Sequence, residues 1–340
     1  MRLVLRPQTL AVLAFASVWF GAGVPAAEAS FPGRNGVIAF SRGGPHGEST
    51  LWVVSPRTGR TRRITHVPRR CGERASAWFD TEPSFSGSGS LVYFHTDSCG
   101  PNAVAEEGIY VIGADGSGRR LIRHIYEEIE FPAFSRTGEF VAYNGNLGEV
   151  LINRVPGPRE RPIGYSCSEG PRCQLLDFPR YLEVADPAWS STGRLALAFG
   201  DGISGHIGVT TPPDPPRRHQ FVTNLVTRSQ SDSKPDWSPR ARRIVFYRWR
   251  VRNDLHSHSN VFVARADGRG RPRRLTKSLD ASFPVWSPNG RRIAYVRSSN
   301  DPDEFVGSLW TMSASDGGGK RLLTSHIEPD QISWEPRPRR

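Results

Sequence analysis

The fold is decided by a stretch at residues 282–295, which reads Ser282-Phe283-Pro284-Val285-Trp286-Ser287-Pro288-Asn289-Gly290-Arg291-Arg292-Ile293-Ala294-Tyr295. It predicts two short strands joined by a turn, because the glycine at 290 readily adopts the positive φ that other residues avoid. Pro284 has no N–H group to donate to a neighbouring strand. We therefore expect the first of the two strands at the edge of its sheet.

The same pattern recurs along the chain, at residues 82–86, 131–135, 186–190 and 234–238, and in a weaker form at 331–335. Its aromatic residues are separated by 49, 55, 48, 49 and 48 positions, and they are Phe85, Phe134, Trp189, Trp237, Trp286 and Trp334. A repeat of about 40 to 50 residues in a chain without helical periodicity is typical of a β-propeller. The sequence predicts an all-β fold, a six-bladed β-propeller of four-stranded antiparallel blades over residues 30–336.

The first blade lacks its own copy of the repeated first strand. Residues 36–41 match the second strand of a blade, and the only spare copy of the pattern is at 331–335. We expect the C-terminal strand to join the first blade and close the ring, which would hide sheet edges that could recruit other chains.

The N-terminus has the three parts of a signal peptide. Arg2 and Arg6 precede an apolar run at 9–24, and Ala27-Glu28-Ala29 offers a small-x-small cleavage site. We expect residues 1–29 to be removed, leaving no membrane span and a periplasmic or extracellular protein. An uncleaved membrane anchor is the alternative, although the run is short for a bilayer. Residues 337–340 form a basic tail.

Export bears on the four cysteines, since an even number in an oxidising compartment suggests disulfides. The expected topology places Cys71 and Cys99 on one face, and Cys167 and Cys173 in one loop. We expect these two pairs. Four free thiols are the alternative, and a zinc site lacks any Cys-x-x-Cys spacing.

Lysine and arginine exceed the acidic residues by 45 − 33 = 12. Such an excess can attract nucleic acid or an acidic polysaccharide. The arginines, however, recur in turns and at strand ends, about one pair per blade, as solubilising charge does. We therefore expect a monomer with no nucleic-acid partner.

The repeated pattern, with Trp286-Ser287-Pro288-Asn289-Gly290 and Ala314-Ser315-Asp316-Gly317 as close matches, resembles the WD-repeat-like blades of the TolB family. The resemblance covers nearly the whole mature chain and implies the fold more than a function, because similar blades occur in prolyl-oligopeptidase-like enzymes and oligogalacturonate lyases. TolB itself has an α/β domain before its propeller. Residues 30–35 leave no room for one, so we expect none here.

Function is expected on the face that carries the long, irregular loops, among them residues 248–259, or at the mouth of the channel on that face. Acidic residues come just before several inner strands, with one lysine among them. The candidate ligand-binding residues are Asp80, Glu82, Glu130, Asp186, Lys234 and Asp330. Converging carboxylates attract a cation or a basic peptide terminus. The alternative is that they point into a water-filled channel and bind nothing specific.

Two functions remain open. The first is a non-catalytic platform for a protein or peptide ligand, without a cofactor, and the sequence has no Gly-x-Ser-x-Gly nucleophile motif. The second is a metal-dependent, lyase-like enzyme acting on an anionic polysaccharide, with a divalent cation held by loop histidines. Its candidate ligands are His95, His124, His256, His258 and His326.

Overall fold

The computed structural model describes residues 31–69, 71–72, 78–97, 99, 106–124, 130–144, 150–155, 173–176, 183–200, 205–211, 224–227, 231–253, 256–277, 280–299 and 306–338. The expected signal peptide and the last two residues of the basic tail lie outside these ranges. The described residues form β-strands, turns and loops, with one short 3₁₀ segment near residue 71 and no α-helix. No helix in these ranges could cross a membrane.

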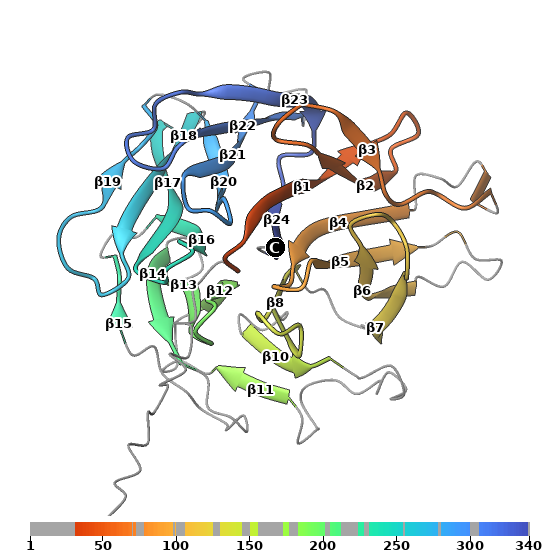
Figure 1. Ribbon diagram of the computed structural model, residues 1–340, viewed down its shortest axis with the longest axis horizontal. Coiled ribbons are helices and arrows are strands. Elements are labelled where there is room, and N and C mark those ends of the chain that lie inside the picture. The colour runs from red at the N-terminus through yellow and green to blue at the C-terminus, as the bar shows by residue number, and fades with distance from the viewer. Residues whose placement is uncertain are drawn as a thin grey trace, which may run out of the picture.

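The strands assemble into sheets arranged around a common centre, here called the channel (Figure 1). One sheet has the order β24-β1-β2-β4-β5-β6-β7, with β3 paired to β2. It consists of two four-stranded units joined by a single parallel bridge between Ser49 and Phe79. Its strands are β1 (Arg34–Gly43), β2 (Ser49–Val54), β3 (Thr61–Arg63), β4 (Trp78–Phe85), β5 (Ser90–Asp97), β6 (Glu106–Gly113), β7 (Arg120–His124) and β24 (Ser333–Arg337).

The other four sheets have four antiparallel strands each, in chain order from the channel outward. They comprise β8 (Glu130–Phe134), β9 (Phe140–Asn144), β10 (Val150–Arg154) and β11 (Cys173–Leu176); β12 (Glu183–Trp189), β13 (Leu195–Gly200), β14 (Gly205–Thr210) and β15 (Asn224–Leu225); β16 (Asp232–Trp237), β17 (Arg243–Asn253), β18 (His256–Arg265) and β19 (Arg273–Arg274); and β20 (Ala281–Trp286), β21 (Arg292–Ser298), β22 (Gly307–Ser313) and β23 (Arg321–Ile327). Pro132, Pro187, Pro235 and Pro284 lie in the innermost, terminal strands, which confirms the edge position expected for Pro284.

The two ends of the folded chain meet in one sheet. β24 pairs antiparallel with β1, with Ile38 opposite Trp334 and Ala39 opposite Ser333. Pairing of residues 331–335 with the first strands was expected. The observed strand, β24, covers residues 333–337. Trp334 packs in a buried cluster with residues of β1 and of the β20–β23 sheet. This cluster joins the first and last sheets of the chain.

The repeated aromatic residues are buried anchors. Phe85, Phe134, Trp189, Trp237, Trp286 and Trp334 all have exposed fractions of 8% or less. Trp237 packs against β13 and β14 of the preceding sheet, and its Nε1 donates a hydrogen bond of 2.9 Å to the Ala188 oxygen. The aromatic residue of a strand therefore fills the space between neighbouring sheets, and the apolar area that it buries favours their packing.

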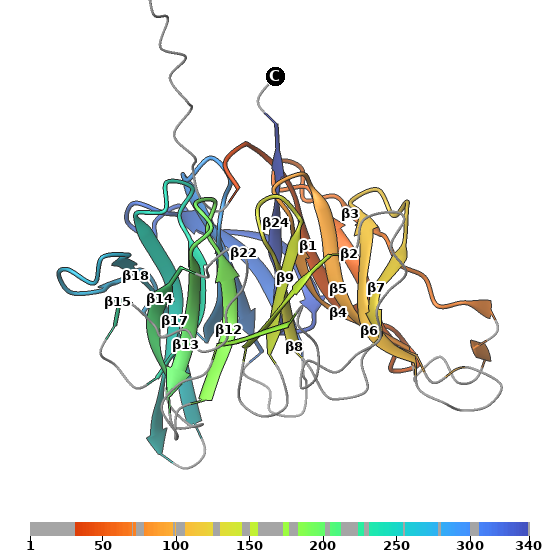
Figure 2. The ribbon, with the colours of Figure 1, turned by 90° about the horizontal axis from the view of Figure 1, so that it is seen from below.

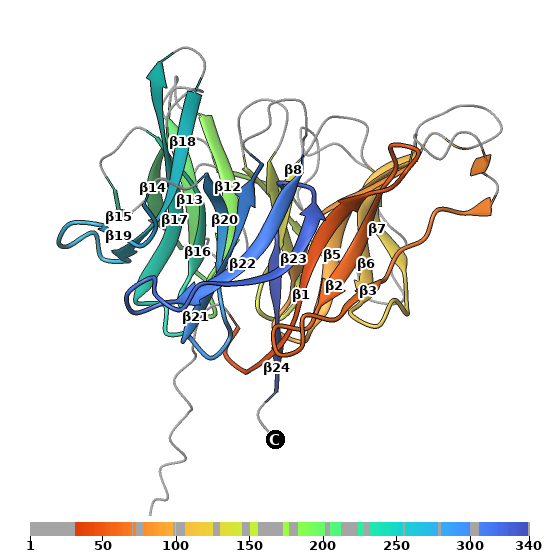
Figure 3. The same cartoon turned by 90° about the horizontal axis from the view of Figure 1, so that it is seen from above.

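Two regions differ from the expectation. Residues 248–259 were expected as an irregular loop, but β17 continues to Asn253 and β18 begins at His256. These two paired strands project on the face away from the C-terminal end (Figures 2 and 3). Cys173 was expected in a loop with Cys167, but it begins β11, and Cys167 lies outside the described residues. The pairing of these two cysteines stays a prediction.

Trp334→Ala tests the contribution of the last strand. Because Trp334 is only 5% exposed, its truncation removes a large buried side chain from the junction of two sheets. We expect a loss of about 3 to 5 kcal/mol in unfolding free energy, measured by urea unfolding. The control is Leu322→Ala, at a residue that is 46% exposed, with an expected change of about 0.5 kcal/mol or less. Equal effects of the two substitutions would contradict the packing of β24.

Candidate functional site

The inner strands carry a repeated backbone irregularity. The residue before each proline has a positive φ: Glu82 (57°), Phe131 (55°), Asp186 (57°), Lys234 (50°) and Phe283 (46°). The register with the second strand shifts at the same place in each of these sheets. Proline cannot donate to the ladder and disfavours a helical conformation in the residue before it, so a bulge forms there. The bulge changes the direction of the preceding side chain at equivalent positions around the channel.

Carboxylates in these strands hold the backbone of the neighbouring sheet. Glu82 Oε2 accepts a hydrogen bond of 2.5 Å from the Phe131 nitrogen. Asp186 Oδ2 accepts one of 3.0 Å from the Lys234 nitrogen. Asp330 Oδ2 accepts one of 3.2 Å from the Glu82 nitrogen. Inner strands have N–H groups that no ladder satisfies, so three of the predicted channel acids connect adjacent sheets.

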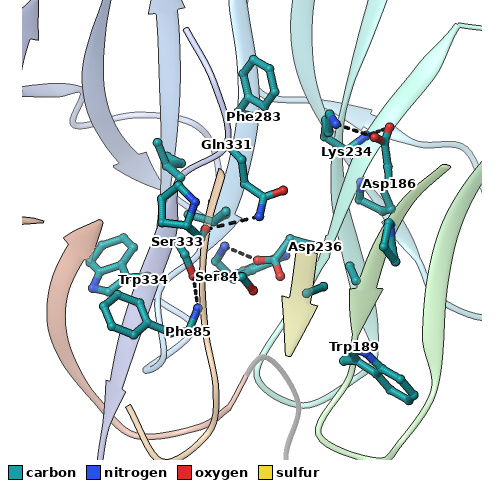
Figure 4. Close-up of a pocket in the computed structure, with 18 of the residues that line it drawn as sticks. Ser84, Phe85, Asp186, Trp189, Lys234, Asp236, Phe283, Gln331, Ser333 and Trp334 are labelled. Atoms are coloured by element: carbon teal, nitrogen blue, oxygen red, sulfur yellow. Dashed lines mark hydrogen bonds and ion pairs between the residues drawn. The ribbon is translucent and has the colours of Figure 1, made fainter. Parts of the chain in front are cut away.

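Lys234 is the cation within this group. Its Nζ lies 2.5 Å from Asp186 Oδ1 (Figure 4) and also contacts the ring of Phe131. Burial lowers the pKa of Lys234, and the Asp186 carboxylate opposes that shift. The structure thus brings Lys234 and Asp186 together, as an ion pair with side chains that are 13% and 9% exposed.

The negative charges of two further carboxyl groups, Glu82 and Asp330, are incompletely balanced by nearby positive charge. Burial raises the pKa of Glu82 well above its ordinary value, and the nearby charge of Asp330 raises it further. Burial also raises the pKa of Asp330. Each carboxyl group disfavours ionisation of the other, because like charges repel more strongly in a low-dielectric site. Additional positive charge here would relieve that repulsion.

Asp236 lines the channel but was missed from the sequence. Its Oδ2 accepts a hydrogen bond of 2.6 Å from the Trp286 nitrogen (Figure 4), and burial raises its pKa to about 7. The repeated pattern did mark Asp236 as unusual. One position after the proline, the other copies have small or apolar residues, namely Ser84, Ala133, Ala188 and Val285, and the C-terminal copy, which lacks the proline, has Ser333.

These residues surround a small cavity. Asp186, Lys234, Asp236, Phe283 and Gln331 are among its lining residues, and its volume is about 90 Å³ (Figure 4). Gln331 Nε2 lies 3.3 Å from the carbonyl oxygens of both Pro83 and Pro132. These contacts connect the segment just before β24 with β4 and β8. The volume admits a few water molecules or one side chain, but not the drug-sized ligands that occupy pockets of about 300 to 1,000 Å³.

Two predicted channel residues, Asp80 and Glu130, are not among the lining residues of this cavity. Asp80 has no exposed surface, and its carboxylate contacts His95 Nδ1 and Trp78 Nε1, each at 2.8 Å. The prediction that Asp80 opens onto the channel mouth is therefore corrected, because the side chain is enclosed within its own sheet. Glu130 begins β8 and is exposed.

The predicted metal-binding histidines are dispersed. His95 is buried against Asp80, whereas His124 and His326 are exposed in β7 and β23. His258 Nδ1 lies 3.2 Å from Asp280 Oδ1. The side chain of His256 lies outside what the structure describes. Among the described residues, no three histidine, cysteine or acidic side chains gather as metal ligands.

The expected Cys71–Cys99 disulfide is present, with Cα atoms 4.8 Å apart. Both cysteines are buried and pack against Trp78, with Val67 beside them. The bond ties the loop that enters β4 to the loop after β5. A disulfide of this kind is typical of proteins that fold in an oxidising compartment.

Comparison with solved structures supports the fold. TolB from Acinetobacter baumannii aligns with a TM-score of 0.62 and 16% identity, over 89% of this chain and 67% of that chain. A putative TolB from Agrobacterium tumefaciens aligns with a TM-score of 0.58 and 15% identity, over 90% and 99%. A puromycin hydrolase aligns with a TM-score of 0.50 and 12% identity, over 90% and 55%.

No protein-family model matches the sequence, and comparison with curated proteins finds no match either. The structural likeness concerns the fold, since the identities are low. The chain has a TolB-like β-propeller fold, as the repeated pattern predicted.

Asp236→Asn tests the buried carboxyl group. Its folded-state pKa of about 7 is raised above an ordinary value of 3.8, so its contribution to stability is present below about pH 4 and is lost as pH rises through about 7. The substitution should remove a loss of roughly 3 kcal/mol in unfolding free energy between pH 4 and 7, measured by urea unfolding at several pH values.

The control for this test is Asp267→Asn. Hydrogen bonding to Arg265 lowers the pKa of Asp267, so this residue titrates below the tested range. Its substitution should leave the slope between pH 4 and 7 unchanged. An unaltered slope in Asp236→Asn would show that the channel carboxyl is ionised throughout.

Proposed function

We propose that this chain is an exported, six-bladed, closed β-propeller that acts as a non-catalytic binding platform. Its central channel takes the cationic end of a protein or peptide ligand, either a free amino terminus or a lysine side chain. The ligand approaches the mouth of the channel, while the rest of its chain lies on the surrounding loops.

The six-bladed ring rests on two observations. The sheets divide into six four-stranded units, if the eight-stranded sheet is separated at its single bridge between Ser49 and Phe79. The pairing of β24 with β1 supplies the missing strand of the first unit. In this arrangement β4, β8, β12, β16, β20 and β24 surround the channel (Figure 1).

Export is supported by the Cys71–Cys99 disulfide and by the N-terminal sequence. The disulfide suits an oxidising compartment, and the apolar run at 9–24 before Ala27-Glu28-Ala29 suits a cleaved signal peptide. Both features agree with a periplasmic or extracellular location.

The observation that carries the binding proposal is the surplus of carboxylates around a cavity of about 90 Å³. Asp186 and Asp236 line the cavity, and Glu82 and Asp330 lie beside it, whereas Lys234 is the one basic side chain among its described lining residues. Burial raises the pKa values of Glu82, Asp236 and Asp330, and the charge of Asp330 raises that of Glu82 further. An incoming ammonium group would be attracted to these carboxyl groups and would fit the available volume.

The metal-dependent lyase has no specific observation in its favour. It needs imidazole or carboxylate ligands that converge, and the described side chains of the candidate histidines are dispersed between a buried sheet interior and separate exposed strands. The channel cavity is also smaller than a pocket for a saccharide unit.

The test uses the mature protein and a pool of hexapeptides labelled at the C-terminus, each prepared with a free and with an acetylated amino terminus. Binding is followed by fluorescence anisotropy at pH 8, where Asp236 is ionised. We expect a subset of free-amine peptides to bind and acetylation to weaken that binding about tenfold, unless the peptide also contains lysine.

Asp236→Asn should weaken the same peptides about tenfold, and Asp267→Asn, at an exposed turn, should have little effect. Binding should also weaken as pH falls from 8 to 5, because Asp236 becomes protonated through its pKa of about 7. Among peptides without lysine, equal binding of the free and the acetylated forms would refute the proposed channel site. The absence of any effect of Asp236→Asn would also refute it.

A further inference from the structure

A second, larger cavity lies at the junction of the first and last units of the chain. Its volume is about 720 Å³, within the range of pockets that hold small ligands. We call it the seam cleft. It is lined by Arg34, Asn35, Gly36, Val37, Ser55, Pro56, Arg57, Asn289, Arg292, Thr311, Gly319, Arg321, Trp334 and Arg337.

The cleft has a strongly one-sided charge. Five of its lining residues are arginines, and none of its described lining residues is acidic. Arg337 Nε pairs with Glu335 Oε2 at 3.0 Å, so one of the five charges is neutralised nearby. For the other four arginines, no ion pair with a carboxylate occurs within the described residues. The cleft therefore keeps a positive charge of about four.

Two of these guanidinium groups are held in place by neutral acceptors. Arg292 Nη2 donates hydrogen bonds to Thr311 Oγ1 at 3.1 Å and to the Gly319 oxygen at 2.7 Å. Arg321 donates to the carbonyl oxygens of Pro56 and Arg57 at 3.3 and 3.2 Å. Neutral acceptors orient a guanidinium without cancelling its charge, and each group has further N–H donors for a ligand.

A buried tryptophan lies at the same place. Trp334 is 5% exposed and is one of the lining residues of the cleft. Its Nε1 is buried, as are those of the equivalent Trp189 and Trp286, so the indole would be a neighbour of a bound ligand and not a donor to it. The geometric basis of the site is therefore the cleft and its arginines.

We propose that the seam cleft binds a small ligand with several anionic groups, such as phosphate or carboxylate. Paired oxygens of these groups match the fork of a guanidinium and accept its hydrogen bonds. The ligand would contact β1, the β2–β3 turn and the β20–β23 sheet together, so its binding stabilises the junction that closes the ring. The site is on the face from which β24 leaves, and it is independent of the proposed peptide site in the channel.

The experiment is isothermal titration of the mature protein with tripolyphosphate and, separately, with digalacturonate, at low ionic strength. The two probes distinguish phosphate from carboxylate recognition. We expect saturable binding of at least one probe with a Kd below about 1 mM, and weaker binding as salt screens the charges.

The test variant is Arg34→Gln/Arg57→Gln, whose side chains line the cleft and make no hydrogen bond within the described part of the chain. The matched control is Arg291→Gln/Lys320→Gln, which removes the same charge from exposed positions next to lining residues Arg292 and Arg321. We expect the test variant to weaken binding at least about tenfold and the control by less than about twofold. Equal weakening would mean that only the overall surface charge matters, and would overturn the proposal.

A second readout locates the ligand. In NMR spectra of the protein, the indole N–H resonance of Trp334 is assigned by its loss in Trp334→Phe. This resonance should shift when the protein is saturated with the bound probe. Binding without a shift of this resonance, or no binding of either probe below about 10 mM, would also overturn the proposal. Melting temperatures of the variants establish that each is folded before titration.

Discussion

The structure depends most on the pairing of β24 with β1. This pairing joins residues about 300 positions apart, as in the bond from the Val37 nitrogen to Glu335 Oε2, which spans 298 positions. Loop closure over such a distance costs chain entropy, and the cost grows only slowly with length. The buried cluster around Trp334 opposes that cost. Without β24, the β20–β23 sheet and β1 would each expose an apolar face.

The same interaction positions both proposed binding sites. Gln331, just before β24, contacts carbonyl oxygens of β4 and β8 and so helps to line the channel. Trp334 and Arg337, within β24, line the seam cleft, and Trp334 also borders the channel cavity. A single short strand thus separates an acidic channel from a basic cleft. The two proposed sites would attract ligands of opposite charge, and neither depends on the chemistry of the other.

The sequence predicted the parts of the fold that repeat. The aromatic anchors, the inner-strand prolines and the spare C-terminal copy each follow a strong local pattern, so the fold and the partner of the last strand were accessible without coordinates. β11 was missed because it has no proline or aromatic signal. The β17–β18 hairpin was missed because alternating arginine, histidine and serine residues resemble a polar loop more than a strand.

The site was less predictable, because it depends on register and on bulges. Asp80 and Glu82 are two positions apart, and simple alternation places them on the same face. The bulge at Glu82 instead turns that residue toward the next sheet, while Asp80 lies directly opposite His95 and bonds to it. The grouping of arginines at the seam was likewise hidden. Arg34, Arg57, Arg292 and Arg321 are far apart in sequence and meet only where the first strands pack beside the β20–β23 sheet.

The most direct measurement of the central claim is disulfide formation between Arg34→Cys and Arg337→Cys, at positions that face each other in the β1–β24 ladder. Under mild oxidation, peptide mapping should find this cross-link in nearly all molecules. The comparison pair is Arg42→Cys with Arg337→Cys, since Arg42 is eight residues farther along β1, about 26 Å away in an extended strand. That pair should remain reduced. Failure of the first pair to cross-link, or equal cross-linking of both pairs, would contradict closure by β24.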